Sequence, residues 1–151
     1  MRVLLQVVDN ASVTVDGQVI ASAGRGLCAY VGIEGGDTPE CAQRVAERIA
    51  NVRLFPGEPG SKKLFDQSVT TVQGDVLLVS NFTLAGRLDS GRRPSWSAAA
   101  SPAEALPVFN ALAAALKDAG VSVITGEFGA EMIVSTSNHG PTNLLISETS
   151  P

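Results

Sequence analysis

The sequence predicts an α+β fold, in one domain that covers residues 1–151. Three observations lead to this prediction. Short apolar runs bounded by turn residues recur along most of the chain, which is typical of strands. Only two segments have the spacing of an amphipathic helix. No internal repeat or linker divides the 151 residues, a length that buries roughly two thirds of the surface of the unfolded chain.

The predicted strands follow one another with short connections. Asp16-Gly17 is a strong signal for a hairpin. The run 76–79 is continuously apolar, as in a strand buried on both faces, and it is the predicted central strand. We expect residues 69–72 to form a hairpin with it through Gln73-Gly74-Asp75. The strands are expected at residues 2–8, 11–15, 18–23, 27–33, 52–55, 69–72, 76–79, 121–125, 131–137 and 142–146.

Two helices complete the prediction. The first begins at Pro39 with Thr38 as its N-cap. The second opens with a capping box from Ser101 to Glu104 and ends at Gly120. Helical spacing turns one face of each helix inward. The side chains expected on these faces are Cys41, Ala42, Val45, Ala46, Ile49 and Ala50 in the first helix and Leu106, Phe109, Leu112, Ala113 and Leu116 in the second.

The charge balance limits how the chain can bind nucleic acid. Eleven basic and fifteen acidic residues give a net charge of −4, which argues against a protein that coats nucleic acid through bulk charge. Any contact with RNA is then local. The dense candidates are the cluster Arg87, Arg92 and Arg93 and the pair Lys62-Lys63.

The chain is expected to be soluble and cytoplasmic. No apolar segment approaches the roughly 20 residues that span a bilayer. The N-terminus lacks the long apolar core and the cleavage site of a secretory signal. Cys28 and Cys41 lie in apolar segments, and we expect both to be buried thiols in a reducing compartment.

The most informative stretch, residues 75–96, joins the central strand to a basic loop. Two hydroxyls and one amide lie where the strand leaves the core, on Ser80, Asn81 and Thr83. The three arginines of the local cluster follow within ten residues of Thr83. Small hydrogen-bonding groups on a rigid strand, with cations just beyond, suit a ligand that has both a small polar head and phosphates.

Conventional catalytic machinery is sparse. One histidine and two distant cysteines cannot supply a convincing zinc site, and residues 57–63 lack the spacing of a phosphate loop, so neither metal nor cofactor is expected. A serine or cysteine triad would need His139, the one histidine; the alternative is a solvent-facing turn residue. Hydroxyls, amides and backbone N–H groups would then carry any catalysis.

The segment Asn138-His139-Gly140-Pro141 is a second informative turn. Glycine before proline removes the restriction that a Cβ would impose, and bonds to proline adopt the cis form in some turns. An ordinary β-turn between two strands is the default interpretation. A functional interpretation places the backbone carbonyls of the turn, rather than its side chains, against a ligand.

Together these segments resemble the D-aminoacyl-tRNA deacylases, also called D-tyrosyl-tRNA deacylases. SNFTL corresponds to the S-Q-F-T-L motif of that family, and NHGP corresponds to its N-x-G-P motif. The similarity covers nearly the whole chain and includes MRVLLQ, ASVTVDG, GRRPSWSAAA and FGAEM. The resemblance implies a largely antiparallel, barrel-like sheet with two main helices.

The resemblance also implies an activity, which is hydrolysis of the ester that joins a D-amino acid to the 3′ end of tRNA, as chiral proofreading in translation. It implies a homodimer in which the Gly-Pro turn of each subunit, with a cis proline, enters the active site of the other. Because rigid backbone would exclude L-residues, many D-amino acids and achiral glycine, as in mischarged glycyl-tRNA, should be accepted. The implied roles are catalysis for Ser80, Asn81 and Thr83, lining of the pocket for Phe82, contact with the terminal adenosine for Phe128 and Met132, chiral screening for Gly140 and Pro141, and contact with tRNA phosphates for Arg92 and Arg93.

Three positions depart from the family pattern: Asn81 replaces the usual Gln, Val7 stands where Arg is common, and Asn143 follows Thr142 directly after the Gly-Pro pair. They favour, as a competing hypothesis, a paralogue with an altered substrate. Two further hypotheses are a non-catalytic RNA-binding module and a plain structural dimer.

Four residues could have a structural role in place of a functional one. Ser80 and Thr83 would then only bond neighbouring backbone, and Arg92 and Arg93 would form ion pairs with Asp89 or other acidic residues. Thr83 acts either as a nucleophile or as a positioning group for an attacking water assisted by the ribose 2′-OH. Trp96, the one tryptophan, is expected in the core rather than on a base-stacking surface.

Overall fold

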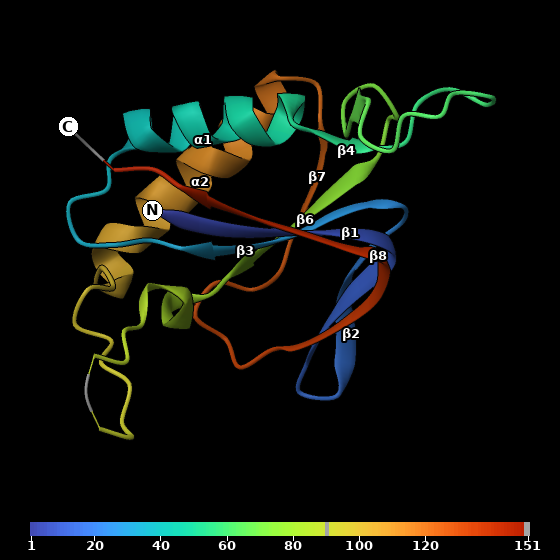
Figure 1. Cartoon of the computed structure of the whole chain (residues 1–151). Coiled ribbons are helices and arrows are strands. Elements are labelled where there is room, and N and C mark those ends of the chain that lie inside the picture. Colours follow the sequence, from blue (N-terminus) through green and yellow to red (C-terminus); the bar gives the residue numbers. More distant parts are fainter. Residues whose placement is uncertain (90, 150–151) are drawn as a thin grey trace.

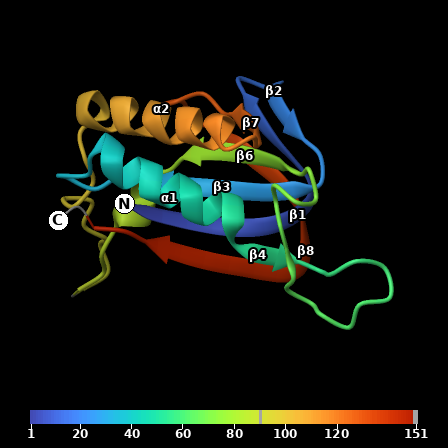
Figure 2. The ribbon, with the colours of Figure 1, turned by 90° about the horizontal axis from the view of Figure 1, so that it is seen from above.

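The computed structural model of the chain describes residues 1–89 and 91–149 (Figure 1). A mixed six-stranded sheet is covered on one face by the helices α1 (Pro39–Asn51) and α2 (Pro102–Asp118) (Figure 2). The α+β class with two main helices is therefore confirmed. The strands are β1 (Arg2–Val15), β2 (Gln18–Ala23), β3 (Gly26–Gly32), β4 (Arg53–Phe55), β5 (Gln67–Ser68), β6 (Asp75–Ser80), β7 (Ser122–Thr125) and β8 (Ile133–Ser147).

Strand β1 joins the two parts of the sheet. Along one edge it pairs antiparallel with β3 and then with β2, and along the other edge it pairs with β8. The expected strands 2–8 and 11–15 are one continuous strand, because β8 follows both halves through register shifts around Val8. The expected hairpin at Asp16-Gly17 is confirmed, with φ angles of 50° and 77°. The C-terminal half of β1 and the N-terminal half of β8 curl away from the helices together with β2, and this curvature makes the sheet barrel-like (Figure 1).

Strand β6 is the central strand, as expected, and it pairs parallel with β3 on one edge and with β7 on the other. The expected hairpin between residues 69–72 and β6 is wrong, because β3 and β7 occupy both edges of β6. Residues 69–74 instead form a compact turn, in which the Gly74 N–H donates to the Val69 carbonyl at 2.9 Å. The short strand before this turn is β5, which pairs with β4.

The helices begin where the sequence predicts. The Thr38 hydroxyl accepts a hydrogen bond from the Cys41 N–H at 3.3 Å, and Ser101 and Glu104 form the expected capping box. The main core lies between the helices and the sheet, and a second cluster lies on the opposite face. Cys28 is buried in the second cluster and Cys41 in the first, as expected. In residues 1–89 and 91–149, neither helix is long and apolar enough to cross a membrane.

One predicted core position in α2 is wrong. Leu106 is 41% exposed, whereas Ala105 and Val108 of the same helix are buried. The inward face of α2 therefore includes Ala105 and Val108 beside the predicted Phe109, and Leu106 lies outside it. Beyond them, Leu112 is fully buried, as expected.

This difference predicts unequal costs for the same substitution in one helix. Leu112→Ala removes a fully buried side chain and should lower the free energy of unfolding by about 2–5 kcal/mol. Leu106→Ala, the matched control, should change it by about 1 kcal/mol or less. Chemical denaturation followed by circular dichroism measures both values. Equal losses in the two variants would contradict this assignment of the core.

Candidate active site

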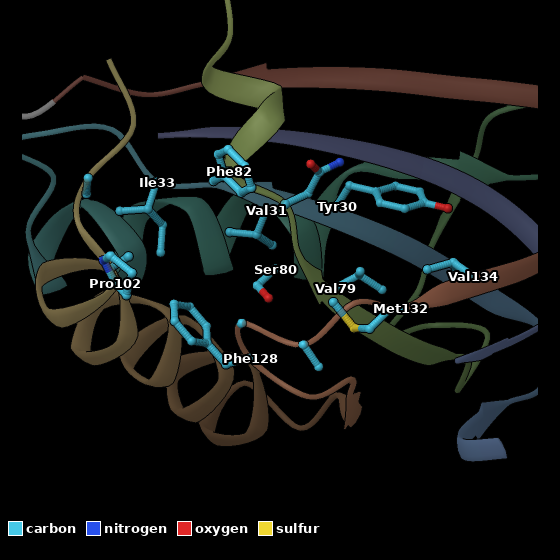
Figure 3. A pocket seen from close by; sticks show the side chains of 15 residues that line it. Tyr30, Val31, Ile33, Val79, Ser80, Phe82, Pro102, Phe128, Met132 and Val134 are labelled. Atoms are coloured by element: carbon cyan, nitrogen blue, oxygen red, sulfur yellow. The ribbon is translucent and has the colours of Figure 1, made fainter. Parts of the chain in front are cut away.

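A cavity of about 570 Å³ opens where β3 and β6 end. These two strands run parallel, so their carboxyl ends meet at one edge of the sheet, with Val31 opposite Ser80. Sites beyond the carboxyl ends of parallel strands commonly bind ligands. The short helix η1 (Phe82–Ala85), the start of α2 and the loop before β8 complete the walls (Figure 3). The cavity is lined by Tyr30, Val31, Ile33, Val79, Ser80, Asn81, Phe82, Ala100, Pro102, Ala105, Phe128, Gly129, Ala130, Met132 and Val134.

The polar end of β6 reaches the cavity as the sequence predicts. The Asn81 N–H donates to the Val31 carbonyl at 2.8 Å, which fixes the chain as it leaves the strand. The Ser80 hydroxyl lies between the walls that carry Phe82 and Phe128 (Figure 3). The Thr83 hydroxyl donates to Oδ1 of Asn81, so the amide nitrogen of Asn81 takes no part in this hydrogen bond. Thr83 itself is exposed and does not line the cavity.

Phe128 and Met132 form the opposite wall, on the loop between β7 and β8. The Phe128 ring packs against Phe109 of α2, with ring centroids 5.6 Å apart. Met132 is seated against Gly126, where a Cβ atom would come within 2.8 Å of its sulfur. The structure thus brings five predicted site residues to one cavity: Ser80, Asn81, Phe82, Phe128 and Met132.

The lining of the cavity contains no charged side chain. Burial raises the pKa of Tyr30 to about 12, and burial also raises the pKa of the neighbouring Cys28 thiol to about 11. Both groups are therefore neutral at physiological pH, and a buried neutral thiol is a poor nucleophile. In the described part of the chain, no three His, Cys, Asp or Glu side chains are grouped so as to hold a metal ion. The site offers hydroxyls, one amide and backbone groups.

The expected β-turn at residues 138–141 is not found. Strand β8 continues through this segment, and its partner register moves from Asn143 opposite Gln6 to Asn138 opposite Val8. Residues 139–142 therefore bulge out opposite the single residue Val7, and we call them the Gly-Pro bulge. The bond before Pro141 in this bulge is cis.

Two side-chain contacts support the Gly-Pro bulge. The Asn138 amide donates to Oδ1 of Asn143 at 3.4 Å across its base. Nδ1 of His139 lies 3.1 Å from a carboxylate oxygen of Asp9. His139 is 66% exposed in its side chain and does not line the cavity, so no serine–histidine triad is assembled within one chain. The exposure agrees with the interpretation of His139 as a solvent-facing residue.

The residues expected to screen chirality, Gly140 and Pro141, lie apart from the cavity. Gly140 and Pro141 are exposed, and neither is among the residues that line it. Gly140 has a φ of 111°, where a side chain would be strained, and an added Cβ would come within 2.6 Å of the Thr142 hydroxyl. The bulge therefore exposes main chain at a position where a side chain would not fit without strain.

The arginine cluster lies on a loop beyond η1. Arg87 and Ser95 exchange backbone hydrogen bonds of 2.9 and 2.8 Å, which close the loop at its base. The ion pairs considered for these arginines are not found: in residues 1–89 and 91–149, Arg87, Arg92 and Arg93 form no ion pair, whereas Arg2, Arg44, Arg48 and Arg53 do. Trp96 is 42% exposed, so its expected place in the core is wrong. Its ring instead meets that of Phe82, with centroids 6.0 Å apart.

Several cavity residues were not predicted from the sequence. Tyr30 interrupts an apolar strand with a polar ring, which is a usable signal. Pro102 and Ala105 face the cavity from the first turn of α2, and Val134 faces it from β8. No local pattern shows these positions, because only the folding of α2 and β8, which are distant in sequence, around one cavity brings them together.

Comparisons with known proteins identify the family of the chain. Residues 4–147 match the family model described as D-Tyr-tRNA(Tyr) deacylase. The chain is 43% identical to the D-aminoacyl-tRNA deacylase of Corynebacterium kroppenstedtii, over 97% of this chain and 95% of that protein. It is 44% identical to the D-aminoacyl-tRNA deacylase of Thermus aquaticus, over 97% of this chain and 93% of that protein.

Solved structures show the same fold. A c-Myc DNA unwinding element binding protein superposes with a TM-score of 0.91 at 32% identity, over 99% of this chain and all of that one. A probable eukaryotic D-amino acid tRNA deacylase superposes with a TM-score of 0.83 at 18% identity, over 96% of this chain and 97% of that one, which is a likeness of fold alone. The match of residues 4–147 and the identities above 40% show that this chain belongs to the D-Tyr-tRNA(Tyr) deacylase family.

Proposed function

We propose that the chain hydrolyses the ester bond between a D-amino acid and the terminal ribose of tRNA, and so removes D-amino acids from translation. Its family makes it a D-aminoacyl-tRNA deacylase, a hydrolase. One observation supports the assignment of the site most directly: the polar SNFTL segment lies at the mouth of a cavity whose other walls are apolar and uncharged. Such a cavity suits an ester and a side chain of variable identity.

The uncharged lining limits the chemistry to positioning and electrostatic stabilisation. The Ser80 hydroxyl, the Asn81 amide and the N–H groups that begin η1 can donate to the oxygen that becomes negative in the tetrahedral intermediate. The lining contains no side chain that would act as a base at neutral pH. We therefore assign the attack to a water molecule assisted by the 2′-OH of the terminal ribose, with the adenosine between Phe128 and Met132.

We assign the discrimination between D- and L-amino acids to the Gly-Pro bulge of a second subunit. The bulge is exposed, braced at its base and outside the cavity of its own chain, as a segment that enters a partner requires. Backbone that cannot move excludes the side chain of an L-residue but tolerates hydrogen at that position. Many D-amino acids, and glycine, would then be substrates.

The three unpaired arginines beyond η1 are assigned to tRNA phosphates. Cations without a protein partner can replace the counterions of a nucleic acid, and this makes binding weaker as salt concentration rises. Arg92 and Arg93 both lie on the loop that follows the cavity mouth in the chain. A Michaelis constant for tRNA that does not change with salt concentration would contradict this role.

The proposed activity is tested with both enantiomers of one substrate. The protein should release tyrosine from D-Tyr-tRNA and leave L-Tyr-tRNA intact, because only the D-form keeps its side chain clear of the bulge. Release is followed by precipitation of radiolabelled aminoacyl-tRNA. Equal hydrolysis of both enantiomers, or of neither, would reject chiral proofreading, and binding without release would favour an RNA-binding module.

The role of Thr83 is tested by two substitutions. Thr83→Ala removes the hydroxyl that holds the Asn81 amide, and kcat should fall roughly tenfold, as for one lost hydrogen bond. Thr83→Ser retains the hydroxyl and is the matched control, with activity near that of the unmodified protein. Single-turnover kinetics on D-Tyr-tRNA measures the chemical step. Total loss in Thr83→Ala would point to a nucleophile instead.

A further inference from the structure

We propose that Trp96 is a stacking platform for the nucleotide that precedes the terminal adenosine at the 3′ end of tRNA. The inference rests on the proposed function and extends its site by one nucleotide. It adds a binding residue outside the cavity, on the segment that joins the cavity mouth to the start of α2.

The first argument is the place of the indole. Phe82 lines the cavity and is 59% exposed, and Trp96 lies directly beyond it at 42% exposed. Their rings meet edge to face, with an interplanar angle of 77° and centroids 6.0 Å apart. A nucleotide chain that leaves the cavity past Phe82 therefore meets the indole next. Base stacking on an aromatic side chain is the usual mode by which proteins bind single-stranded nucleic acid.

The second argument is that the indole is held in place without being buried. A Cβ atom added to Gly86 would lie 2.2 Å from Cζ3 and 2.6 Å from Cε3 of Trp96, so the ring rests against the main chain at that position. The backbone bonds between Arg87 and Ser95 fix the residue next to the tryptophan. One side of the ring is thus supported by the protein, while a large fraction of its surface remains open to solvent.

The third argument is charge. The loop between Gly86 and Trp96 includes three arginines with no ion pair in the described part of the chain. A protein partner could bury these cations without a large cost only by supplying a carboxylate for each of them. A nucleic acid supplies phosphates for them and bases for the indole at the same time. The combination favours a single strand of RNA over a second protein surface.

The single tryptophan makes a binding test direct. We expect the trinucleotide CCA to quench the fluorescence of Trp96 and adenosine alone to leave it unchanged, because adenosine ends at the cavity. The trinucleotide has no amino acid attached, so the result does not depend on ester hydrolysis. The proposed function and this inference can therefore fail separately. Equal quenching by both ligands, or none by either, would overturn the inference.

A kinetic test uses two substrates that differ only beyond the terminal nucleotide. Trp96→Ala should lower kcat/KM for D-Tyr-tRNA roughly tenfold, because the nucleotide before the terminal adenosine loses its stacking partner. The same variant should change hydrolysis of 3′-O-D-tyrosyl-adenosine less than about twofold, because this substrate lacks that nucleotide. Trp96→Phe should restore part of the loss. Leu88→Ala, which removes another exposed apolar side chain from the same loop, is the matched control and should match the unmodified protein on both substrates.

Two results of this experiment would overturn the inference. One is an equal loss of kcat/KM on both substrates, which would mean that Trp96 only supports Phe82 and the cavity mouth. The other is a change of oligomeric state in Trp96→Ala, measured by analytical ultracentrifugation, which would mean that a second subunit covers the indole.

Discussion

The parallel pairing of β6 between β3 and β7 is the constraint on which the site depends. At its start, β6 approaches β3 so closely that a Cβ atom on Gly26 would lie 1.9 Å from the Asp75 carbonyl oxygen, and this contact sets the register of the two strands. The register then places Ser80 beside Val31, where both strands end. After Ser80 the chain leaves the sheet and continues into η1, and the residues at this exit, Ser80, Asn81 and Phe82, line the cavity.

The site that results works through shape and dipoles rather than through charged side chains. The described residues of its lining are uncharged, and burial raises the pKa values of Tyr30 and of the neighbouring Cys28 further above neutral pH. Groups that are fixed before the substrate arrives need little reorganisation in the transition state. Under the proposed function the same logic applies to chirality, since main chain braced by Asp9 and Asn143 would discriminate by exclusion and not by recognition of a particular side chain.

The sequence correctly predicted those structural features that depend on residues close to one another in the chain. Both helix starts, the Asp16-Gly17 hairpin and the polar end of β6 follow from side chains within a few residues of one another. The errors arose where distant segments decide. Residues 69–72 could not join β6, whose edges belong to β3 and β7, and residues 138–141 did not turn, because β1 continues beside them. Trp96 was expected in the core from its size, whereas the bare backbone of Gly86 seats it at the surface.

The central claim is that an uncharged pocket in one subunit is completed by the Gly-Pro bulge of another, and dimers built from two different variants test it most directly. One subunit has Ser80→Ala and Asn81→Ala in the pocket, and the other has Gly140→Ala and Pro141→Ala in the bulge. The pocket variant alone should be inactive, whereas the bulge variant alone should hydrolyse D-Tyr-tRNA and L-Tyr-tRNA alike, because its bulge no longer excludes L-residues. Mixed dimers, isolated with two affinity tags, should have about half of the activity of the unmodified dimer on D-Tyr-tRNA and should again leave L-Tyr-tRNA intact, because one intact pocket then receives one intact bulge. Inactive mixed dimers, or a failure to form any dimer, would contradict the account.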